Sequence, residues 1–561
     1  MRKRKIVNFI RLCPLTLVLF AGGCRNDPLS VRNVDQPGTP RSPTEIDTFI
    51  SKLMEQEWNG NQGATGNIAV QASVLSLESY SALANFGMGA RATIPRGTIS
   101  NALGNSTQTE NFRDFDFFTR NGRSAANLVK DLEASIAGGA TTGTTATDNR
   151  DRSFAYYELA YAIAYTAMIY DSAAILSPAL GISDVPPLVT SKSAMDAALQ
   201  FMDSAQKYAV GMADIPGAWV SGTAIGSARW IQIIHSQKAR FRAGVARTPT
   251  QRIAVDWNAV VADAAAGITT DFVINADATN GWGSGWRNQF AVGTTWSQMT
   301  PILLGMGDTS KVGDPLGSYS DWLTQSLANK TPFLMRTPDL RFPSGETRTA
   351  QQNNFTGSSR AGPPSGCVPT VAATRCAILY FRNRLVGEDS PGGDPFGIWY
   401  YDNWRFWSVR ANAQNGPIIE MSVAENDLLR AEGLIRTNKI AEAAVLIDKT
   451  RTRAGLPGVT GIVDLTTPVP GGSACVPSVP QPPTYTTRAC GNIFEAMKWE
   501  KRLETAFTGY AQWYFDNRGW GDLPQGTVYE WPVPWQELSA RLNTNFYTTT
   551  GSRAGPGTYG F

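Results

Sequence analysis

The chain has 561 residues and a formal net charge of +3 at neutral pH. Five positive charges lie among its first 23 residues, which contain no acid, so the remainder carries a formal charge of −2. A chain without a basic excess has no field with which to hold phosphates, and this excludes most nucleic-acid binders. Charged residues make up 17% of the sequence, below the ~25% of an average globular protein. The composition indicates an exported protein with polar, aromatic-rich loops.

Residues 1–23 have the layout of a signal peptide. A basic cluster, MRKRK, is followed by an apolar run at 12–21 that is too short to remain in a bilayer, and then by small residues. The segment LFAGGC resembles a bacterial lipoprotein processing site, which predicts cleavage before Cys24 and acylation of its thiol, as by palmitate. An ordinary secreted protein is the alternative. Residues 24–42 contain three prolines and few apolar side chains, and are expected to form a lipidated tether.

Four cysteines remain once Cys13 leaves with the leader and Cys24 is acylated. They form two pairs that are close in sequence, Cys367 with Cys376 and Cys475 with Cys490. An even remainder in an exported chain predicts two local disulfides. A four-cysteine metal site is the competing interpretation, and the absence of a CxxC pair disfavours it.

Residues 43–271 show helical periodicity and predict a series of helical hairpins. Helices are expected at 43–58 with Ser42 or Thr44 as the N-cap, 68–86, 152–170, 194–210 with Ser191 as the N-cap, 228–246 and 257–267. The helix at 152–170 is the most hydrophobic of the chain, and we expect it at the centre of the fold.

Residues 272–416 lose this periodicity and are rich in Gly, Pro, Asn and Trp, with short strands expected at 377–384 and 397–401. Long irregular segments on a compact scaffold usually carry function. Aromatic rings that could stack against sugars gather in two clusters, GWGSGWRNQFAVGTTW and WYYDNWRFW. The candidate ligand contacts are Trp282, Trp286, Trp296, Trp399, Tyr400 and Trp404. The alternative is that these rings only pack the loops against the helices.

Residues 417–538 predict a further helical hairpin and a long helix, before a tail at 539–561. In the hairpin at 419–457, Ala431 and Ala443 allow two helices to approach closely, as in tetratricopeptide units of ~34 residues. Gly455 and Pro457 end its second helix. Such a hairpin cannot bury its own apolar face and needs stacked neighbours. Asn492 is expected to cap a helix over 493–521, and the prolines of WPVPWQEL predict an extended turn.

Signals for catalysis are weak. The single histidine, His235, has no second histidine or nearby cysteine, and no phosphate loop, GxSxG elbow or HExxH occurs. Asp308 and Asp314 could ligate Ca²⁺, although two acids in a loop are usually only solvated. Glu500 and Glu504 lie one helical turn apart and could in principle serve a glycoside hydrolase, but structural ion pairs are favoured. We therefore expect no catalytic residue, no metal and no cofactor.

The sequence resembles the SusD/RagB family of outer-membrane nutrient-binding lipoproteins in AENDLLRAEGLIRTNKIAEAAVLIDKTRTRAGLP, EKRLETAFTGYAQWYFDNRGWG and WPVPWQEL. The resemblance implies a mainly α single domain over 43–561, in which tetratricopeptide-like hairpins form a right-handed superhelical scaffold with irregular loops and few short strands. It also implies an outward-facing lid on a SusC-like TonB-dependent transporter barrel in the outer membrane of a Gram-negative-type bacterium. The matching signature residues are expected to be fold determinants: Glu500, Arg502, Glu504, Phe507, Gly509, Trp513, Phe515, Asp516, Arg518 and Trp520.

The leading hypothesis is therefore a lipid-anchored surface protein that captures a nutrient, with an oligosaccharide as the favoured class, and passes it to the transporter without altering it. A helical glycoside hydrolase and a tetratricopeptide-type scaffold that binds only protein are the alternatives.

Overall fold

The structure is a computed structural model. It describes residues 41–62, 68–79, 91–103, 108–181, 183–283, 299–310, 317–326, 329, 331–352, 379–384, 400–406, 409, 412, 414–547 and 553–555. The predicted signal peptide, Cys24 and the Cys367–Cys376 pair lie outside these residues.

Helices form most of the regular structure, as predicted. Those of the N-terminal half are α1 (Pro43–Ile50), α2 (Leu53–Asn61), α3 (Ile68–Leu75), α5 (Gln108–Ala137), α6 (Thr145–Ile169), α7 (Ser191–Ala209), α8 (Ser227–Gly244), α9 (Pro249–Ile253) and α10 (Trp257–Ala265). Those that follow are α12 (Pro301–Leu304), α13 (Tyr319–Thr324), α14 (Arg348–Gln352), α16 (Val423–Arg436), α17 (Ile440–Arg451), α18 (Ile493–Thr505), α19 (Gln512–Trp520) and α20 (Trp535–Ala540). Short 3-10 turns lie at η2 (Gly217–Trp219), η3 (Ala278–Asn280), η4 (Gly305–Gly307) and η8 (Gly472–Ala474).

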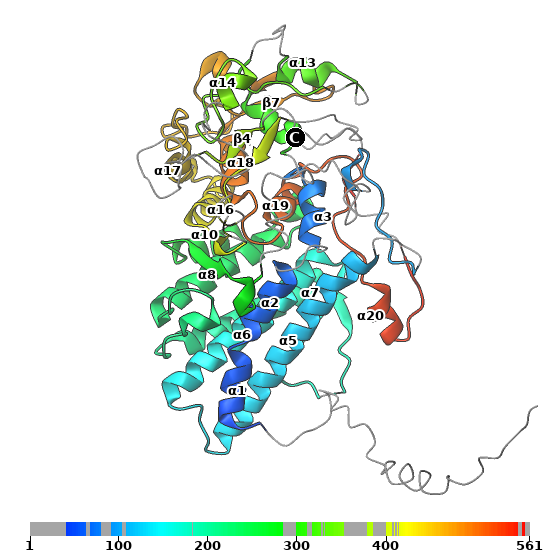
Figure 1. The fold of residues 1–561 in the computed structure, drawn as a ribbon, viewed down its shortest axis with the longest axis vertical. Helices are drawn as coiled ribbons and strands as arrows, with labels where there is room; N and C mark the ends of the chain where they lie inside the picture. The colour runs from blue at the N-terminus through cyan, green and yellow to red at the C-terminus, as the bar shows by residue number, and fades with distance from the viewer. Residues whose placement is uncertain are drawn as a thin grey trace, which may run out of the picture.

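The helices pack as a continuous stack. Helix α5 packs against α6, α6 against α7, α7 against α8, α8 against α10, α10 against α16, and α16 against both α17 and α18. Figure 1 shows this order along the long axis, with α1 and α5 towards one end and α17 and α18 towards the other. The stacked neighbours that the hairpin at 419–457 requires are therefore present, and the predicted tetratricopeptide-like architecture is confirmed.

Strands are short and form two-stranded antiparallel sheets in the described residues. They are β1 (Ser172–Ala174) with β2 (Leu188–Thr190), β3 (Phe272–Ala276) with β6 (Gly416–Met421), β4 (Phe381–Asn383) with β5 (Tyr401–Asn403), and β7 (Ser478–Pro480) with β8 (Arg488–Cys490). In these pairs Ser172 lies opposite Thr190, Val273 opposite Ile419, Phe381 opposite Asn403, and Ser478 opposite Cys490. The β3–β6 pair joins the two ends of the loop-rich region, so that this region returns to the helical scaffold where it left it.

The hairpin of α16 and α17 has the predicted small-residue seam. Ala431 and Ala443 are fully buried, and Gly455 ends the segment with φ +77°, a conformation that glycine adopts without steric cost. Gly433 lies where α16 meets α10, and a Cβ there would approach Val261 Cγ2 to 2.6 Å. The absence of a side chain at Gly433 therefore permits the close contact between the two helices.

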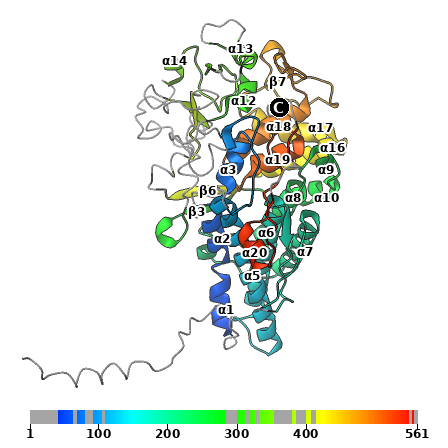
Figure 2. The ribbon, with the colours of Figure 1, turned by 90° about the vertical axis from the view of Figure 1, so that its right-hand side faces the viewer.

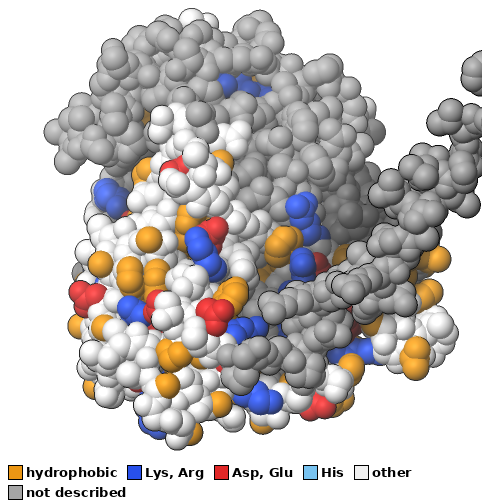
Figure 3. Space-filling view, turned by 60° about the horizontal axis from the view of Figure 1, so that its bottom comes forward, with side chains coloured by type: hydrophobic (Ala, Val, Ile, Leu, Met, Phe, Trp, Pro, Cys, Tyr) orange, Lys and Arg blue, Asp and Glu red, His pale blue; other side chains and the backbone are white. Residues whose placement is uncertain are grey.

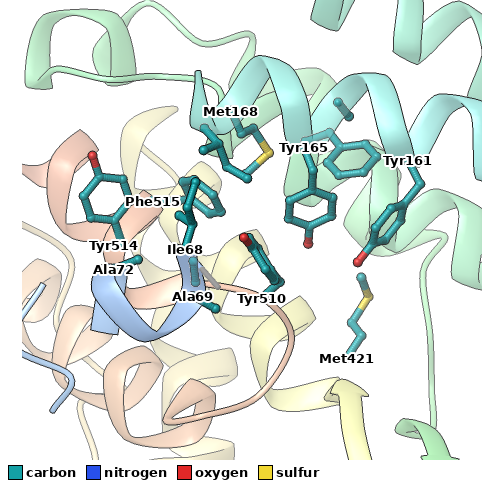
Figure 4. Close-up of a cluster of buried hydrophobic side chains, with 14 of the residues drawn as sticks. Ile68, Ala69, Ala72, Tyr161, Tyr165, Met168, Met421, Tyr510, Tyr514 and Phe515 are labelled. Carbon is teal, nitrogen blue, oxygen red and sulfur yellow. The ribbon is translucent and has the colours of Figure 1, made fainter. Parts of the chain in front are cut away.

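Helix α6 is the centre of the fold, as predicted. Almost every side chain from Phe154 to Ile169 is buried, which is typical of a helix covered on all sides. Figure 4 shows Tyr161 and Tyr165 of α6 facing Tyr510 and Met421 from distant parts of the chain. The Tyr165 ring lies 5.3 Å from the Tyr510 ring, edge to face. The segment between α18 and α19 is thus packed directly onto the central helix.

Several predicted boundaries are wrong. The helix expected at 43–58 is divided into α1 and α2, with Ser42 as the N-cap of α1 through a capping box to Glu45. The helix expected at 68–86 ends at Leu75, and the N-cap of α7 is Thr190 instead of Ser191. Helix α20 occupies part of the segment for which an extended turn was expected.

The helix expected over 493–521 is two helices. Phe507, Gly509 and Ala511 have φ values of +55°, +54° and +55°. Residues in the left-handed region cannot continue a right-handed helix, so α18 ends at Thr505 and α19 begins at Gln512. Within the break, the Phe507 backbone N–H donates to Glu78 Oε1 at 2.6 Å, which stabilises the interrupted chain.

The disulfide between Cys475 and Cys490 is present, as predicted. It closes a loop with a sequence separation of 15 and ties the β7–β8 hairpin together.

We expect neither cysteine to react with a thiol reagent in the unreduced protein. The double variant Cys475→Ser with Cys490→Ser should lose about 3 kcal/mol of stability, because the unfolded chain regains the entropy of an open loop. Mass spectrometry after alkylation and urea denaturation measure the two effects. Labelling of Cys475 without reductant would contradict the prediction.

Candidate ligand-binding surface

The described elements of the loop-rich region lie on one side of the helical stack. Figure 2 shows β3, β6 and α14 on one side of the molecule, and α16 and α17 on the other. Of the six predicted ligand contacts, Trp282, Tyr400 and Trp404 are among the described residues, whereas Trp286, Trp296 and Trp399 lie outside them.

Trp282 lies against α2 and has little contact with solvent. Its side chain is 3% exposed, and its ring centroid is 6.2 Å from that of Trp58. Trp58 Nε1 donates to the carbonyl oxygen of Gly283 at 2.5 Å, and Asn59 bonds the backbone of Gly281 and Gly283. These bonds hold the start of the first aromatic cluster to α2.

Tyr400 and Trp404 flank β5 and stack on arginines. The Arg382 guanidinium lies 4.0 Å from the centre of the Trp404 ring, and Arg348 lies 4.3 Å from that of Tyr400. Trp404 is 5% exposed, and its backbone N–H donates to the Tyr380 carbonyl oxygen at 2.6 Å. Each arginine occupies one face of its ring, as in other cation–π pairs.

The three described residues of the two aromatic clusters therefore pack the loops against the rest of the protein. In this conformation neither Trp282 nor Trp404 presents an open ring face to a sugar, because both side chains are buried. Tyr400, which is half-buried, retains some access to solvent. Contact of all six residues with a ligand stays a prediction, and Trp286, Trp296 and Trp399 lie outside the described residues.

Glu500 and Glu504 form part of a buried ion-pair cluster instead of an open carboxylate pair. Arg341 Nη1 lies 2.8 Å from Glu500 and 3.2 Å from Glu504, and Arg453 lies 2.9 Å from Glu504. Burial raises the pKa of Glu500, whereas for Glu504 the nearby arginines outweigh burial and lower its pKa. One arginine bridges both carboxylates, so a sugar cannot enter between them. This geometry supports the structural interpretation of the pair.

The remaining polar candidates also have structural partners. His235 Nδ1 lies 2.8 Å from Asp263 Oδ1, and its Nε2 lies 3.1 Å from the Gln206 amide nitrogen, which links α8 to α10 and α7. Asp308 is buried and accepts hydrogen bonds from Ser310 and from backbone N–H groups, including that of Tyr319 at 3.0 Å. Asp314 lies outside the described residues.

A set of buried carboxyl groups in the core was not predicted from the sequence. Glu57, Asp114 and Glu158 each lie on helices that surround α6 or belong to it. Burial raises the pKa of Asp114 to about 7 and that of Glu158 to about 8, and burial beside Glu158 raises the pKa of Glu57 well above its usual value. The burial of these carboxyl groups could not be predicted from the sequence, because acidic residues lie beside apolar residues in surface helices as well.

Charged side chains of both signs are mixed on the end of the molecule that Figure 3 shows. Figure 3 shows Lys and Arg interspersed with Asp and Glu over the coloured part of one end of the molecule. Mixed charges of this kind do not attract a phosphate backbone, which agrees with the composition. Among the described residues, no helix is both long and apolar enough to span a bilayer.

The sequence matches no family model and no curated protein. Solved structures, by contrast, share its fold over most of its length. A SusD-like protein from Bacteroides fragilis has 12% identity and a TM-score of 0.53, over 90% of this chain and 96% of its own. A SusD homologue from Parabacteroides distasonis has 11% identity and a TM-score of 0.52, over 89% and 93%.

A SusD superfamily protein from Bacteroides thetaiotaomicron has 14% identity and a TM-score of 0.50, over 91% of this chain and 99% of its own.

Most of the signature residues expected to determine the fold are buried in α18, α19 and the break between them, with Trp520 half-buried. The resemblance noted in the sequence is thereby confirmed at the level of structure: the chain has the SusD/RagB fold.

Proposed function

We propose that this protein is a lipid-anchored, outward-facing binding protein of the outer membrane. It captures a nutrient, with an oligosaccharide as the favoured class, and passes it to a SusC-like TonB-dependent transporter without covalent chemistry. The observation that carries the proposal is the SusD/RagB fold, which extends over about nine-tenths of the chain at matching length. The lipoprotein-type sequence before Cys24 supports the anchor.

The packing of the described aromatic rings supports a binding role. The Trp282 ring is fixed against α2 and the Trp404 ring against β4, and rigid support of this kind lowers the entropy lost when a ligand is bound. The ion pairs around Glu500 and Glu504 disfavour the hydrolase alternative. Binding without turnover is therefore the function that the described residues support best.

The test is a binding screen of the chain from Asn26 onward against neutral oligosaccharides and against peptides. We expect at least one oligosaccharide to bind, with no change in the ligand after incubation. The variant with Trp286, Trp296 and Trp399 changed to Ala should bind the oligosaccharide at least about tenfold more weakly, because stacking faces are lost. Phe49→Ala, which removes a half-exposed ring on α1, is the control and should bind normally. Binding of peptides alone would refute the oligosaccharide assignment, and binding of neither class would refute ligand capture.

A further inference from the structure

A cavity of about 520 Å³ lies between the β7–β8 hairpin and the N-terminal half of α18. Figure 1 shows β7 and α18 next to each other in the upper part of the molecule. The lining contains no residue of the two aromatic clusters of the loop-rich region. Its volume falls within the ~300–1,000 Å³ typical of small-molecule sites.

Rings form the walls of this cavity. Tyr485 and Phe494 are half-buried, as is Trp520, and the proline rings of Pro480 and Pro482 lie beside them. Flat apolar surfaces of this size suit the C–H faces of a pyranose ring. Arg436 lies 5.0 Å from the centre of the Phe494 ring and Arg502 lies 5.3 Å from that of Trp520, so each ring can offer a sugar only the surface that its arginine leaves uncovered.

Charges at the base of the cavity are compensated. Lys498 and Asp522 are buried, and Lys498 Nζ lies 2.9 Å from Glu495 Oε1 and 2.6 Å from Asp522 Oδ2. Lys498 is the cation of the lining, so an anion would find no unpaired positive charge. A purely apolar guest would cover Glu495, whose side chain is 23% exposed, without replacing its contact with water, which is costly. Carboxylate oxygens have about four lone-pair positions and can accept further hydrogen bonds from hydroxyl groups. The base thus favours a neutral guest with hydroxyl donors.

The walls are held in place before any ligand arrives. The Cys475–Cys490 disulfide fixes β8, and Arg488 of this strand donates to the Asp308 carbonyl oxygen at 2.7 Å and to Ser320 Oγ at 2.9 Å. Asn492, the N-cap residue of α18, donates from Nδ2 to the Leu465 carbonyl oxygen at 2.8 Å. A cavity that is already formed loses little entropy on binding.

We propose that this cavity is a second binding site, which holds a neutral saccharide of one or two rings between Trp520, Tyr485 and Phe494, with a hydroxyl group on Glu495. The ligand class rests on the proposed function, whereas the location rests on the cavity itself. The site lies on the β7–β8 and α18 part of the fold and is separate from the tryptophan-bearing loops.

The experiment measures hydrogen–deuterium exchange of the mature chain with and without maltose, cellobiose and laminaribiose. With at least one of the three sugars, we expect occupation of this cavity to slow amide exchange in peptides that cover 478–495. Tyr485→Ala and Glu495→Gln should each weaken the affinity of that sugar for this segment by about tenfold, through loss of a stacking face or of a charged acceptor. The matched control is Glu442→Gln, which removes an exposed acid from the same first-turn position of α17 and should change nothing.

The outcomes separate this site from the proposed function. Slower exchange only in other parts of the chain, or an affinity that Glu495→Gln and Tyr485→Ala leave unchanged, would overturn the cavity as a site while leaving oligosaccharide capture intact. Absence of binding by these disaccharides together with binding of longer oligosaccharides elsewhere would have the same meaning. Absence of any saccharide binding would overturn both proposals.

Discussion

Arg252→Ala is expected to destabilise the protein by about 3–5 kcal/mol, the cost of leaving a buried charge without its partner. The Arg252 side chain is fully buried. Its Nε and Nη2 donate to the two carboxylate oxygens of Glu432 at 3.0 and 2.6 Å, and Nη2 also lies 3.0 Å from Asp516 Oδ1. One guanidinium therefore joins α9, α16 and α19, which are distant in the sequence.

The remaining charges of this junction explain why the loss would be large. Arg252 is the strongest opposing influence on Glu432: burial raises the pKa of Glu432, but Arg252 and then Arg436 and Lys501 outweigh it and hold the carboxylate ionised. Without Arg252, the Glu432 carboxylate loses its bidentate partner, and Arg436 at 2.9 Å holds only one oxygen. Trp520 Nε1 also donates to Glu432, so the ring of a cavity-lining residue depends on the same carboxylate.

Urea denaturation of wild type and variant measures the effect. Arg252→Lys should lose less than the alanine variant, because it keeps the charge but not the two parallel hydrogen bonds. Lys449→Ala is the matched control, since Lys449 pairs with Asp427 at 2.8 Å on the surface and such pairs contribute about 0–1 kcal/mol. A midpoint for Arg252→Ala equal to that of Lys449→Ala would show that the junction does not hold the helices together.

The junction also shows what the sequence could and could not predict. The hairpin of α16 and α17 was predictable, because Ala431, Ala443 and Gly455 show locally where two helices meet and where the second ends. The pairing of Arg252 with Glu432 was not, because the two residues are 180 positions apart and both resemble ordinary surface residues of a helix. Long-range ion pairs of this kind depend on the packing of the stack, which periodicity does not specify.

Helix α5 illustrates a second limit. Its sequence is rich in charged and polar side chains, and its apolar stripe, which includes Phe115, Phe118 and Leu132, is narrow. This helix was therefore not predicted from the sequence. In the candidate site, by contrast, the residues could be predicted but the orientation of their side chains could not. The rings of Trp282 and Trp404 could be identified as a cluster, but whether a ring faces solvent or an arginine depends on contacts with α2 and β4 that local sequence does not contain.

The second large effect is a loss of stability as the pH rises from about 5 to about 8. Glu158 has a pKa of about 8 in the folded protein, raised from 4.5 by burial, and Asp114 has a pKa of about 7, raised from 3.8. A carboxyl whose folded pKa is raised contributes stability that is fully present below its unfolded pKa and is lost as the pH rises to and through the folded value. A pKa that differs by one between the folded and the unfolded protein corresponds to ~1.4 kcal/mol, so the loss should amount to several kcal/mol.

The surroundings of Glu158 determine which variant tests this. Asn121 of α5 donates to Glu158 at 3.3 Å, Glu57 of α2 interacts with it, and Tyr157 of α6 lies within its electrostatic reach. Arg240 of α8 forms an ion pair with Glu425 at 2.8 Å and does not neutralise Glu158 directly. Because Glu158 is held protonated in the folded protein at neutral pH, Glu158→Gln replaces it with a group of the same shape that does not ionise.

We expect Glu158→Gln to reduce the loss of stability with rising pH, and Glu158→Gln with Asp114→Asn to reduce it further. Urea midpoints measured from about pH 5 to about pH 8 give the slope, since ionisation of lysines near 10.4 and of the buried tyrosines falls above this range. Acid loss of stability should persist in these variants, because it comes from carboxylates such as Glu432 whose pKa is lowered in the fold and which must be protonated as the pH falls. A slope as steep in Glu158→Gln as in the wild type would assign the loss to other groups and would mean that Glu158 is ionised within the folded core.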